Sequence, residues 1–171
     1  NRLVGQLLHV ARLDSLALDT SQSVDLSQIA RQTLEAMAPL AIQRGKSIEL
    51  SEPEVPVTVF GDGPSIEDAL RNLIENALVH AESNQPVEVR VEAYGSVRVC
   101  DQGKGIPAVD RAHLFDRFWR GNSASRDNPG AGLGLAIVQE IMKLHGGSVT
   151  LTDNQPQGSC FTLTFRTTNS S

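Results

Sequence analysis

Residues 128–135 read Asn-Pro-Gly-Ala-Gly-Leu-Gly-Leu and place glycines at three alternate positions, Gly130, Gly132 and Gly134. An apolar helical pattern follows, which predicts a helix over residues 133–145. Glycine lets a ligand approach the backbone closely, and the start of a helix presents free N–H groups at the positive end of its dipole. The stretch by itself fits two interpretations, an anion site for phosphate and a flexible loop before a core helix, and the rest of the chain has to decide between them.

The composition predicts a folded domain. The chain has 171 residues, of which 40% are hydrophobic and 20% charged, which is unlike a disordered segment. A net charge of −5 argues against a broad nucleic-acid surface. No apolar stretch approaches the roughly 18 residues of a membrane span, so we expect no membrane contact. The chain opens on Asn1 rather than Met, so we expect it to be a piece of a longer protein.

The two cysteines, Cys100 and Cys160, each lie within a strand-like run. They show no spacing typical of a zinc site. We therefore expect two small, buried, unpaired side chains in a protein of a reducing compartment.

The order of the predicted elements indicates the fold class. Strands occur in pairs separated by helices, which predicts an α/β (α+β) two-layer sandwich. We expect a mixed, mostly antiparallel sheet of about five strands, covered on one face by about three helices. The predicted helices are 2–18, 24–45, 65–81 and 133–145, and the predicted strand pairs are 47–50 with 57–60, 87–94 with 96–100, and 148–152 with 159–166.

The second predicted helix has recognisable ends. Asp25 or Ser27 is expected to cap it, and Gly45 to end it. Pro39 predicts a kink or an early stop inside it. The region 103–125 is expected to be mostly loop.

Two asparagines mark the helix over residues 65–81. Asn72 and Asn76 are four positions apart and therefore share one helix face. An amide oxygen is a suitable ligand for Mg²⁺ beside water and phosphate oxygens. The alternative is an ordinary solvated face.

A carboxylate and two glycines follow the strand at residues 96–100. Asp101 ends the strand, and Gly103 and Gly105 come after it. The carboxylate can accept a hydrogen bond from an exocyclic amine such as that of adenine, while the glycines admit the base. The alternative is an Asp-x-Gly turn.

Other nucleotide-binding motifs are missing. The sequence has no P-loop, and its glycine spacing does not match the Rossmann fingerprint. His80, His113 and His145 show no metal-ligand spacing.

Four stretches occur in a specific order: Asn-Leu-Ile-Glu-Asn-Ala at 72–77, Asp-Gln-Gly-Lys-Gly-Ile-Pro at 101–107, Leu-Phe-Asp-Arg-Phe-Trp-Arg at 114–120 and Gly-Ala-Gly-Leu-Gly-Leu at 130–135. Together they resemble the N, G1, F and G2 boxes of the catalytic, ATP-binding domain of bacterial sensor histidine kinases, which has the Bergerat fold. The resemblance covers residues 24–166.

The resemblance implies ATP and Mg²⁺ as cofactors and assigns roles at the site. Asn76 would coordinate Mg²⁺ with Asn72 beside it, and Asp101 would bind the adenine amino group. The expected adenine slot is formed by Gly103, Gly105 and Ile106. The expected phosphate side contains Arg117, Arg120, Gly130, Gly132, Leu133, Gly134 and Leu135, with a mobile lid over about residues 120–133.

The resemblance also implies a domain plan and partners. Residues 1–18 resemble the second helix of the dimerisation and phosphotransfer hairpin, 19–23 a hinge, 24–166 the catalytic domain and 167–171 a polar tail. The expected partners are the phosphoacceptor histidine helix of the same kinase dimer and a response regulator receiver domain. The implied location is a cytoplasmic domain of a protein anchored in the bacterial inner membrane.

Two positions bear on the reaction. Val79 stands where many members carry Lys or Arg, and we retain its neighbour His80 as a candidate ATP-binding residue. ATPases of this fold, such as gyrase, carry a Glu four residues before the metal asparagine, where this chain has Asn72. Asn72 cannot act as a general base, which favours a kinase over an ATP-hydrolysing module. The intact motif stretches argue against a nucleotide-binding module without chemistry.

Overall fold

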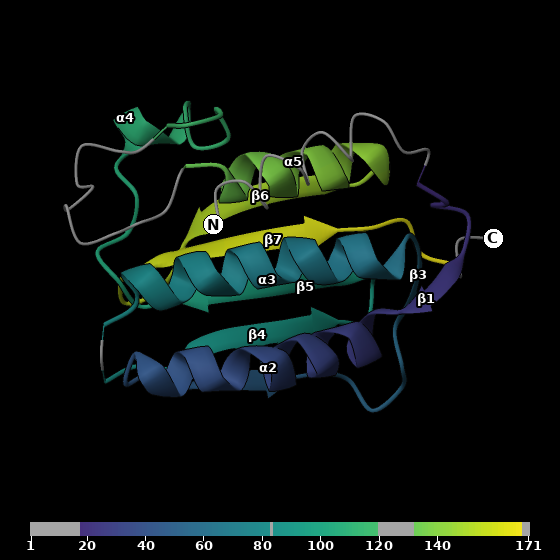
Figure 1. Cartoon of the computed structure of the whole chain (residues 1–171), viewed down its shortest axis with the longest axis horizontal. Coiled ribbons are helices and arrows are strands. Elements are labelled where there is room, and N and C mark those ends of the chain that lie inside the picture. The colour runs from purple at the N-terminus through teal and green to yellow at the C-terminus, as the bar shows by residue number, and fades with distance from the viewer. Residues whose placement is uncertain (1–17, 83, 120–131, 169–171) are drawn as a thin grey trace.

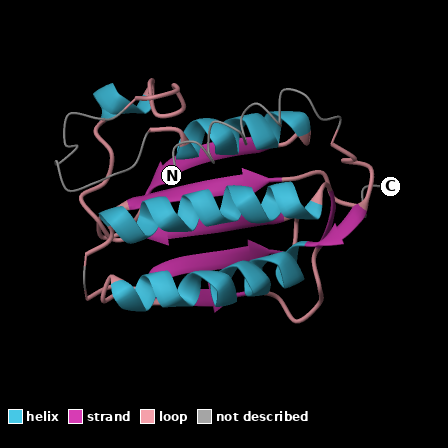
Figure 2. Ribbon diagram, viewed as in Figure 1, coloured by secondary structure: helices cyan, strands magenta, loops and turns pink. Residues whose placement is uncertain are grey.

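The computed structural model describes residues 18–82, 84–119 and 132–168. A five-stranded sheet in the order β2-β4-β5-β7-β6 forms one layer, and helices α2, α3 and α5 cover one of its faces (Figure 1). A two-stranded sheet of β1 and β3 lies beside these layers (Figure 2). The elements are β1(Ser23–Asp25), α2(Leu26–Gln43), β2(Ile48–Ser51), β3(Thr58–Phe60), α3(Gly63–His80), β4(Val87–Glu92), β5(Ser96–Asp101), α4(Ala108–Arg111), α5(Gly134–Leu144), β6(Ser148–Asp153) and β7(Ser159–Thr164).

The architecture confirms the predicted sandwich and corrects one strand pair. β2 and β3 do not pair with each other: β2 pairs in parallel with β4, and β3 pairs antiparallel with β1. Val24, expected in a helix, belongs to β1. Hydrophobic alternation shows which face of a strand is buried but does not choose its partner strand, and the linker containing Pro53 and Pro56 is long enough to part the two strands.

Side-chain caps explain where the two long helices begin. Asp25 accepts a hydrogen bond from the Gln28 backbone N–H at 3.0 Å. Asp62 does the same for Ser65 at 3.0 Å, so α3 begins at Gly63, two residues before the predicted start. In each case the carboxylate satisfies an N–H group that has no partner within the helix.

Helix α2 continues through Pro39 to Gln43, so the early stop considered at Pro39 is wrong. Pro39 and Glu35, whose carbonyl loses its helical partner, are both exposed, so water can satisfy that carbonyl. The buried residues Met37 and Ala41 hold the helix against the domain on either side of Pro39. Gly45 follows the helix end at φ +65°, as expected for a glycine C-cap.

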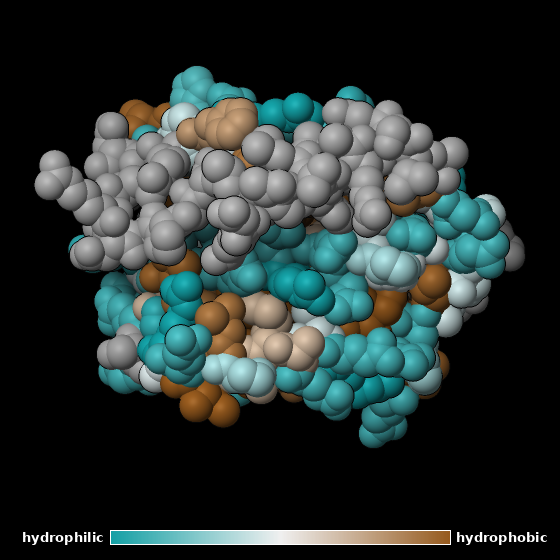
Figure 3. Space-filling model, in the orientation of Figure 1, coloured by the Kyte–Doolittle hydropathy of each residue, from teal (hydrophilic) through white to brown (hydrophobic). Residues whose placement is uncertain are grey.

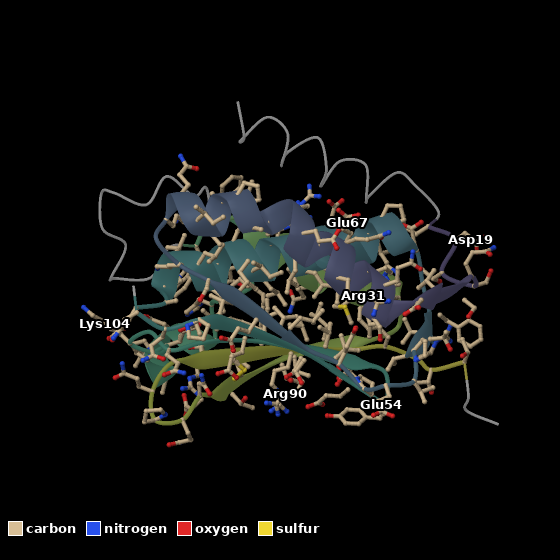
Figure 4. All side chains as sticks on the ribbon, turned by 90° about the horizontal axis from the view of Figure 1, so that it is seen from below. Asp19, Arg31, Glu54, Glu67, Arg90 and Lys104 are labelled. Atoms are coloured by element: carbon tan, nitrogen blue, oxygen red, sulfur yellow. A yellow bond between two sulfur atoms is a disulfide. The ribbon has the colours of Figure 1, made fainter. Side chains whose placement is uncertain are left out.

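The core lies between the helices and the sheet. Alternate residues of β4, Val87, Val89 and Val91, are at most 3% exposed. They face the helical layer, where α3 contributes most of its apolar residues. Arg90, at an intervening position, points away from the helices (Figure 4).

The cysteines are buried as expected, but the expectation that they are unpaired is wrong. Cys100 and Cys160 lie directly opposite each other on β5 and β7 and form a disulfide with a Cα–Cα distance of 4.1 Å. The register places Cys100 on the same sheet face as Arg98 and Arg90, away from the helices. Sixty positions separate the two cysteines, so their pairing depends on the strand register.

The short helix α4 interrupts a region predicted to be loop. None of the helices in the described ranges has the length and hydrophobicity needed to cross a membrane. The expected helix at residues 2–18 falls outside the described residues, apart from Leu18, which packs against the core.

Candidate active site

Helix α3 carries the asparagine pair on its partly exposed side. Asn72 and Asn76 are both of intermediate exposure. The Asn72 side-chain Nδ2 donates to the Asp68 carbonyl at 2.8 Å, one turn earlier in the helix. This hydrogen bond orients the amide group through its donor, so that its oxygen can act as an acceptor.

That oxygen faces the start of α5. A Cβ at Gly134 would lie 3.1 Å from Asn72 Oδ1. The glycine therefore allows the first residue of α5 to approach the amide of α3 closely. The structure brings together two stretches that are 62 positions apart, and both were predicted to bind the phosphate side of a nucleotide.

Asp101 is a nearly buried carboxylate at the end of β5, only 4% exposed. Burial raises its pKa above the usual value, while the backbone N–H groups of Gly103 and Ser159 and the nearby His80 and Lys46 oppose that rise. Gly103 N–H donates to Asp101 Oδ1 at 2.8 Å. A carboxylate can accept about four hydrogen bonds, so these two backbone donors leave capacity for a ligand amine.

Gly103 lies against the last residue of α3. A Cβ on Gly103 would be 2.2 Å from the His80 carbonyl oxygen, so only glycine fits here. The structure thus places His80 beside the turn that follows Asp101. The His80 side chain reaches solvent, but neighbouring protein atoms lower its pKa by desolvation, against the attraction of Asp101.

The loop beyond Gly103 is held by contacts with the β6–β7 end. Gly105 has φ +74°, and a Cβ on it would lie 3.4 Å from the Gly158 carbonyl oxygen. The Ile106 carbonyl accepts a 3.0 Å hydrogen bond from Arg111 Nε, and Ile106 itself packs against the core. The three residues predicted for the adenine slot therefore form one continuous loop beside Asp101.

The phosphate-side residues are only partly described. Gly132 has φ +71°. Its carbonyl accepts a hydrogen bond from Phe118 N–H at 3.0 Å, which links the motif stretch at residues 114–120 to the one at residues 130–135. Leu133 is 1% exposed and contributes its side chain to the core, and Leu135 is half-buried. Arg117 is exposed. Arg120, Gly130 and most of the predicted lid lie outside the described residues.

Sequence reasoning missed three residues that support this region. Asn154 Nδ2 donates to the Asp101 carbonyl at 2.8 Å. Arg111 forms an ion pair with Asp153 in addition to its bond to Ile106. Lys46 contacts the end of α3. None belongs to a recognised motif, and the only local signal is that Lys46 follows a helix-ending glycine.

Two open hollows in the described part of the chain lie elsewhere. Each has a volume of about 540 Å³, and both are lined by Tyr94 and Thr167. Tyr94 is in the turn between β4 and β5, whereas Asp101 is the last residue of β5, so the two lie at opposite ends of that strand. Neither hollow contains a candidate ATP-binding residue, so we keep the site at the ends of α3 and β5.

The described residues fit ATP and Mg²⁺ in their chemistry. Asp101 supplies a buried acceptor for an amine, and the amide of Asn72 supplies an oxygen. The expectation that Gly103 leaves room for the base is not met, because the His80 carbonyl occupies the place of its missing side chain. Within residues 18–82, 84–119 and 132–168, no three His, Cys, Asp or Glu side chains form a metal-binding group. A divalent cation here would therefore depend on amide and phosphate oxygens, which Mg²⁺ accepts.

A family model described as "Histidine kinase-, DNA gyrase B-, and HSP90-like ATPase" matches residues 61–169. The chain is 34% identical over 167 residues to sensor protein KdpD of Escherichia coli, covering 95% of this chain and 18% of KdpD. It is 34% identical over 161 residues to the signal transduction histidine-protein kinase/phosphatase MprB of Mycolicibacterium smegmatis, covering 92% of this chain and 32% of MprB. The chain thus spans less than a third of the length of these relatives.

A solved structure supports the same relationship. The crystal structure of full-length ShkA in complex with AMPPNP matches 97% of this chain and 36% of that chain, with 31% identity and a TM-score of 0.77. The chain therefore belongs to the family of histidine kinase-, DNA gyrase B- and HSP90-like ATPases, and its relatives within that family include sensor histidine kinases.

Proposed function

We propose that this chain is the catalytic, ATP-binding domain of a sensor histidine kinase, which transfers the γ-phosphoryl group of ATP to a histidine on a dimerisation domain. The observation that carries the proposal is the position of Asn72. Asn72 lies next to Gly134, between helices α3 and α5. An ATPase of this fold would need a Glu at the position of Asn72 to activate water. The amide of Asn72 can bind and orient but cannot accept the proton of water, so an ATP-hydrolysing module is not favoured.

The proposed roles follow the chemistry of each residue. Asp101 accepts a hydrogen bond from the adenine amino group, and the loop of Gly103, Gly105 and Ile106 contacts the base. Asn76 binds Mg²⁺, with Asn72 beside it. Bound Mg-ATP would supply the reactive phosphoanhydride bond, and the positive charge of Mg²⁺ would partly neutralise the negative charge of the phosphates. The protein then contributes mainly positioning, which is the dominant requirement in phosphoryl transfer.

The remaining residues are proposed to act at the phosphates. Arg117 and Arg120 would offset phosphate charge, and His80 would lie near the nucleotide from the end of α3. Gly130, Gly132, Gly134 and the backbone of Leu133 and Leu135 would approach the phosphates at the start of α5. Val79 contributes no charge, so the arginines would replace the basic residue that other members carry on this helix.

The proposed partners are a phosphoacceptor histidine helix of the same kinase dimer and the receiver domain of a response regulator. In this proposal the chain is a cytoplasmic domain of a larger protein anchored in the bacterial inner membrane. Residues 1–18 would be part of the dimerisation hairpin, residues 19–23 a hinge and residues 24–166 the catalytic unit. A place in a larger signalling protein is supported by the two relatives, a sensor protein and a histidine-protein kinase/phosphatase, of whose length the chain spans less than a third.

The proposal is tested by adding a separately expressed dimerisation hairpin and radiolabelled Mg-ATP to the chain. We expect acid-labile, base-stable label on the hairpin, which is typical of phosphohistidine, and none on the chain alone. Asn76→Ala should abolish the label. Rapid steady hydrolysis of ATP by the isolated chain, without label on the hairpin, would instead establish the ATPase alternative.

A further inference from the structure

Lys46 makes a long-range contact that no motif predicts. It lies between the end of α2 and the start of β2, and its Nζ donates to the carbonyls of Leu78 at 2.6 Å and Ala81 at 2.5 Å. These acceptors are 32 and 35 positions away along the chain. The side chain is half-buried. Lys46 therefore places a positive charge and two donors at the end of α3.

A positively charged donor such as the Lys46 ammonium group stabilises the C-terminal end of a helix. The last carbonyls of a helix have no partner within it and form the negative end of its dipole. In α3, the Ala77 carbonyl accepts from Ala81 N–H, and Lys46 satisfies the next carbonyl, that of Leu78. Lys46 thus holds the last turn of α3 in a fixed position relative to the sheet.

The same turn touches the proposed adenine site. In sequence, His80 lies between Leu78 and Ala81, whose carbonyls accept from Lys46. The His80 carbonyl is the atom that approaches Gly103 too closely for any side chain. Gly103 in turn donates its N–H to Asp101. A continuous set of contacts therefore runs from Lys46 through the last turn of α3 to Gly103 and the Asp101 carboxylate.

Electrostatic interactions also link Lys46 to Asp101. Burial lowers the pKa of Lys46, and nearby Arg44 adds to this effect, while Asp101 opposes it. Conversely, Lys46 and His80 favour the ionised form of Asp101 against the burial that raises the pKa of its carboxyl. Lys46 therefore supports the protonation state that accepts a hydrogen bond from an amine.

We infer that Lys46 is a positioning residue for adenine recognition, which acts by holding the last turn of α3 against the Asp101–Gly103 turn. The inference rests on the proposed role of Asp101. It assigns to a residue outside the four motif stretches a share in selecting the base. A residue that only stabilised the fold would affect all nucleotides alike.

The test compares ATP with inosine triphosphate, in which a carbonyl oxygen replaces the 6-amino group and would face the Asp101 carboxylate. Binding of each Mg-nucleotide to the 171-residue chain is measured by isothermal titration calorimetry for the wild type and for Lys46→Met. We expect Lys46→Met to lower the affinity for ATP by about tenfold, as for a lost charged hydrogen-bond network, with little change for inosine triphosphate. Lys46→Arg, which keeps charge and donors, should recover part of the preference.

The controls separate this inference from the site assignment. Lys143→Met removes the same charge from an exposed lysine in the last turn of α5 and should leave both affinities unchanged. Asp101→Asn should reduce the preference for ATP; if it does not, the adenine site is wrongly assigned and the inference fails with it. If Asp101→Asn reduces the preference but Lys46→Met leaves it at the wild-type value, Lys46 has no role in base selection. Lys46→Gln, which keeps one donor group, replaces Lys46→Met if the latter does not fold.

Discussion

Asn72 on α3 and Gly134 at the start of α5 are in such close proximity that a Cβ on Gly134 would lie 3.1 Å from the Asn72 amide oxygen. The amide cannot rotate away freely, because its Nδ2 donates to the Asp68 carbonyl. This contact joins the proposed metal-binding helix to the proposed phosphate-binding glycines. The relative position of these two helices is therefore expected to control nucleotide binding.

Gly134→Ala should weaken Mg-ATP binding. The added methyl group must displace either the Asn72 amide or the start of α5. Loss of one hydrogen bond to the nucleotide by such a displacement costs about 1 kcal/mol, which corresponds to about fivefold in affinity. Titration with a fluorescent ATP analogue measures the change. The matched control is Gly63→Ala at the first residue of α3, where a Cβ would meet only the Ile29 Cδ1 atom at 3.9 Å. Equal affinities for wild type and Gly134→Ala would show that the contact does not matter for ATP.

Asn76→Ala should abolish Mg²⁺-dependent ATP binding, because the ion loses a fixed amide ligand. The measurement is ATP affinity with Mg²⁺ and with excess chelator, for the wild type and the variant. We expect the wild type to bind more weakly without Mg²⁺ and the variant to bind weakly in both conditions. A variant that retains the full effect of Mg²⁺ would contradict the metal assignment.

Binding of adenine nucleotides should weaken on acidification at a higher pH than an ordinary aspartate would predict. Burial raises the pKa of Asp101 above its usual value of 3.8, and the protonated acid is a poorer acceptor for the adenine amine. The affinity for adenine nucleotides is therefore expected to decrease as the pH falls through this raised pKa. His80 does not contribute near neutral pH, because its lowered pKa keeps it neutral there.

The pH experiment measures the ratio of ATP to inosine triphosphate affinity from about pH 8 down to the lowest pH at which the chain stays folded, so that titration of the phosphates, which are identical in both, cancels. Asp101→Asn should show no such dependence. A wild-type ratio that stays constant down to the pH at which the chain unfolds would contradict the assignment of Asp101 as the adenine acceptor.

Reduction of the Cys100–Cys160 disulfide should destabilise the domain. The bond joins β5 and β7 one residue before Asp101 and closes a loop of 60 positions. The loss is expected to be about 2–4 kcal/mol of unfolding free energy. Chemical denaturation with and without a dithiol reductant measures it, and the double variant Cys100→Ser, Cys160→Ser should show no effect of reductant. Two free thiols per chain before reduction would mean that the bond does not form.

Local chemistry was sufficient to predict most individual elements. The alternating valines at 87, 89 and 91, the four-residue spacing of Asn72 and Asn76, and the glycine after α2 each depend on the geometry of a single strand, helix or turn. The order of the four motif stretches also indicated the family, because that order is a property of the chain alone. The sheet covered by helices on one face followed from the order of the predicted helices and strand pairs.

Contacts between distant segments were decided only by the tertiary structure. Periodicity shows which face of a strand is buried but not which strand lies beside it, so the parallel pairing of β2 with β4 and the Cys100–Cys160 bond were not predicted. Figure 3 shows that hydrophilic side chains separate small hydrophobic patches on the helical face, and this arrangement depends on how the helices pack. Likewise, the contacts of Lys46 with α3 and of His80 with Gly103 exist only because folding brings together residues that carry no local signal for each other.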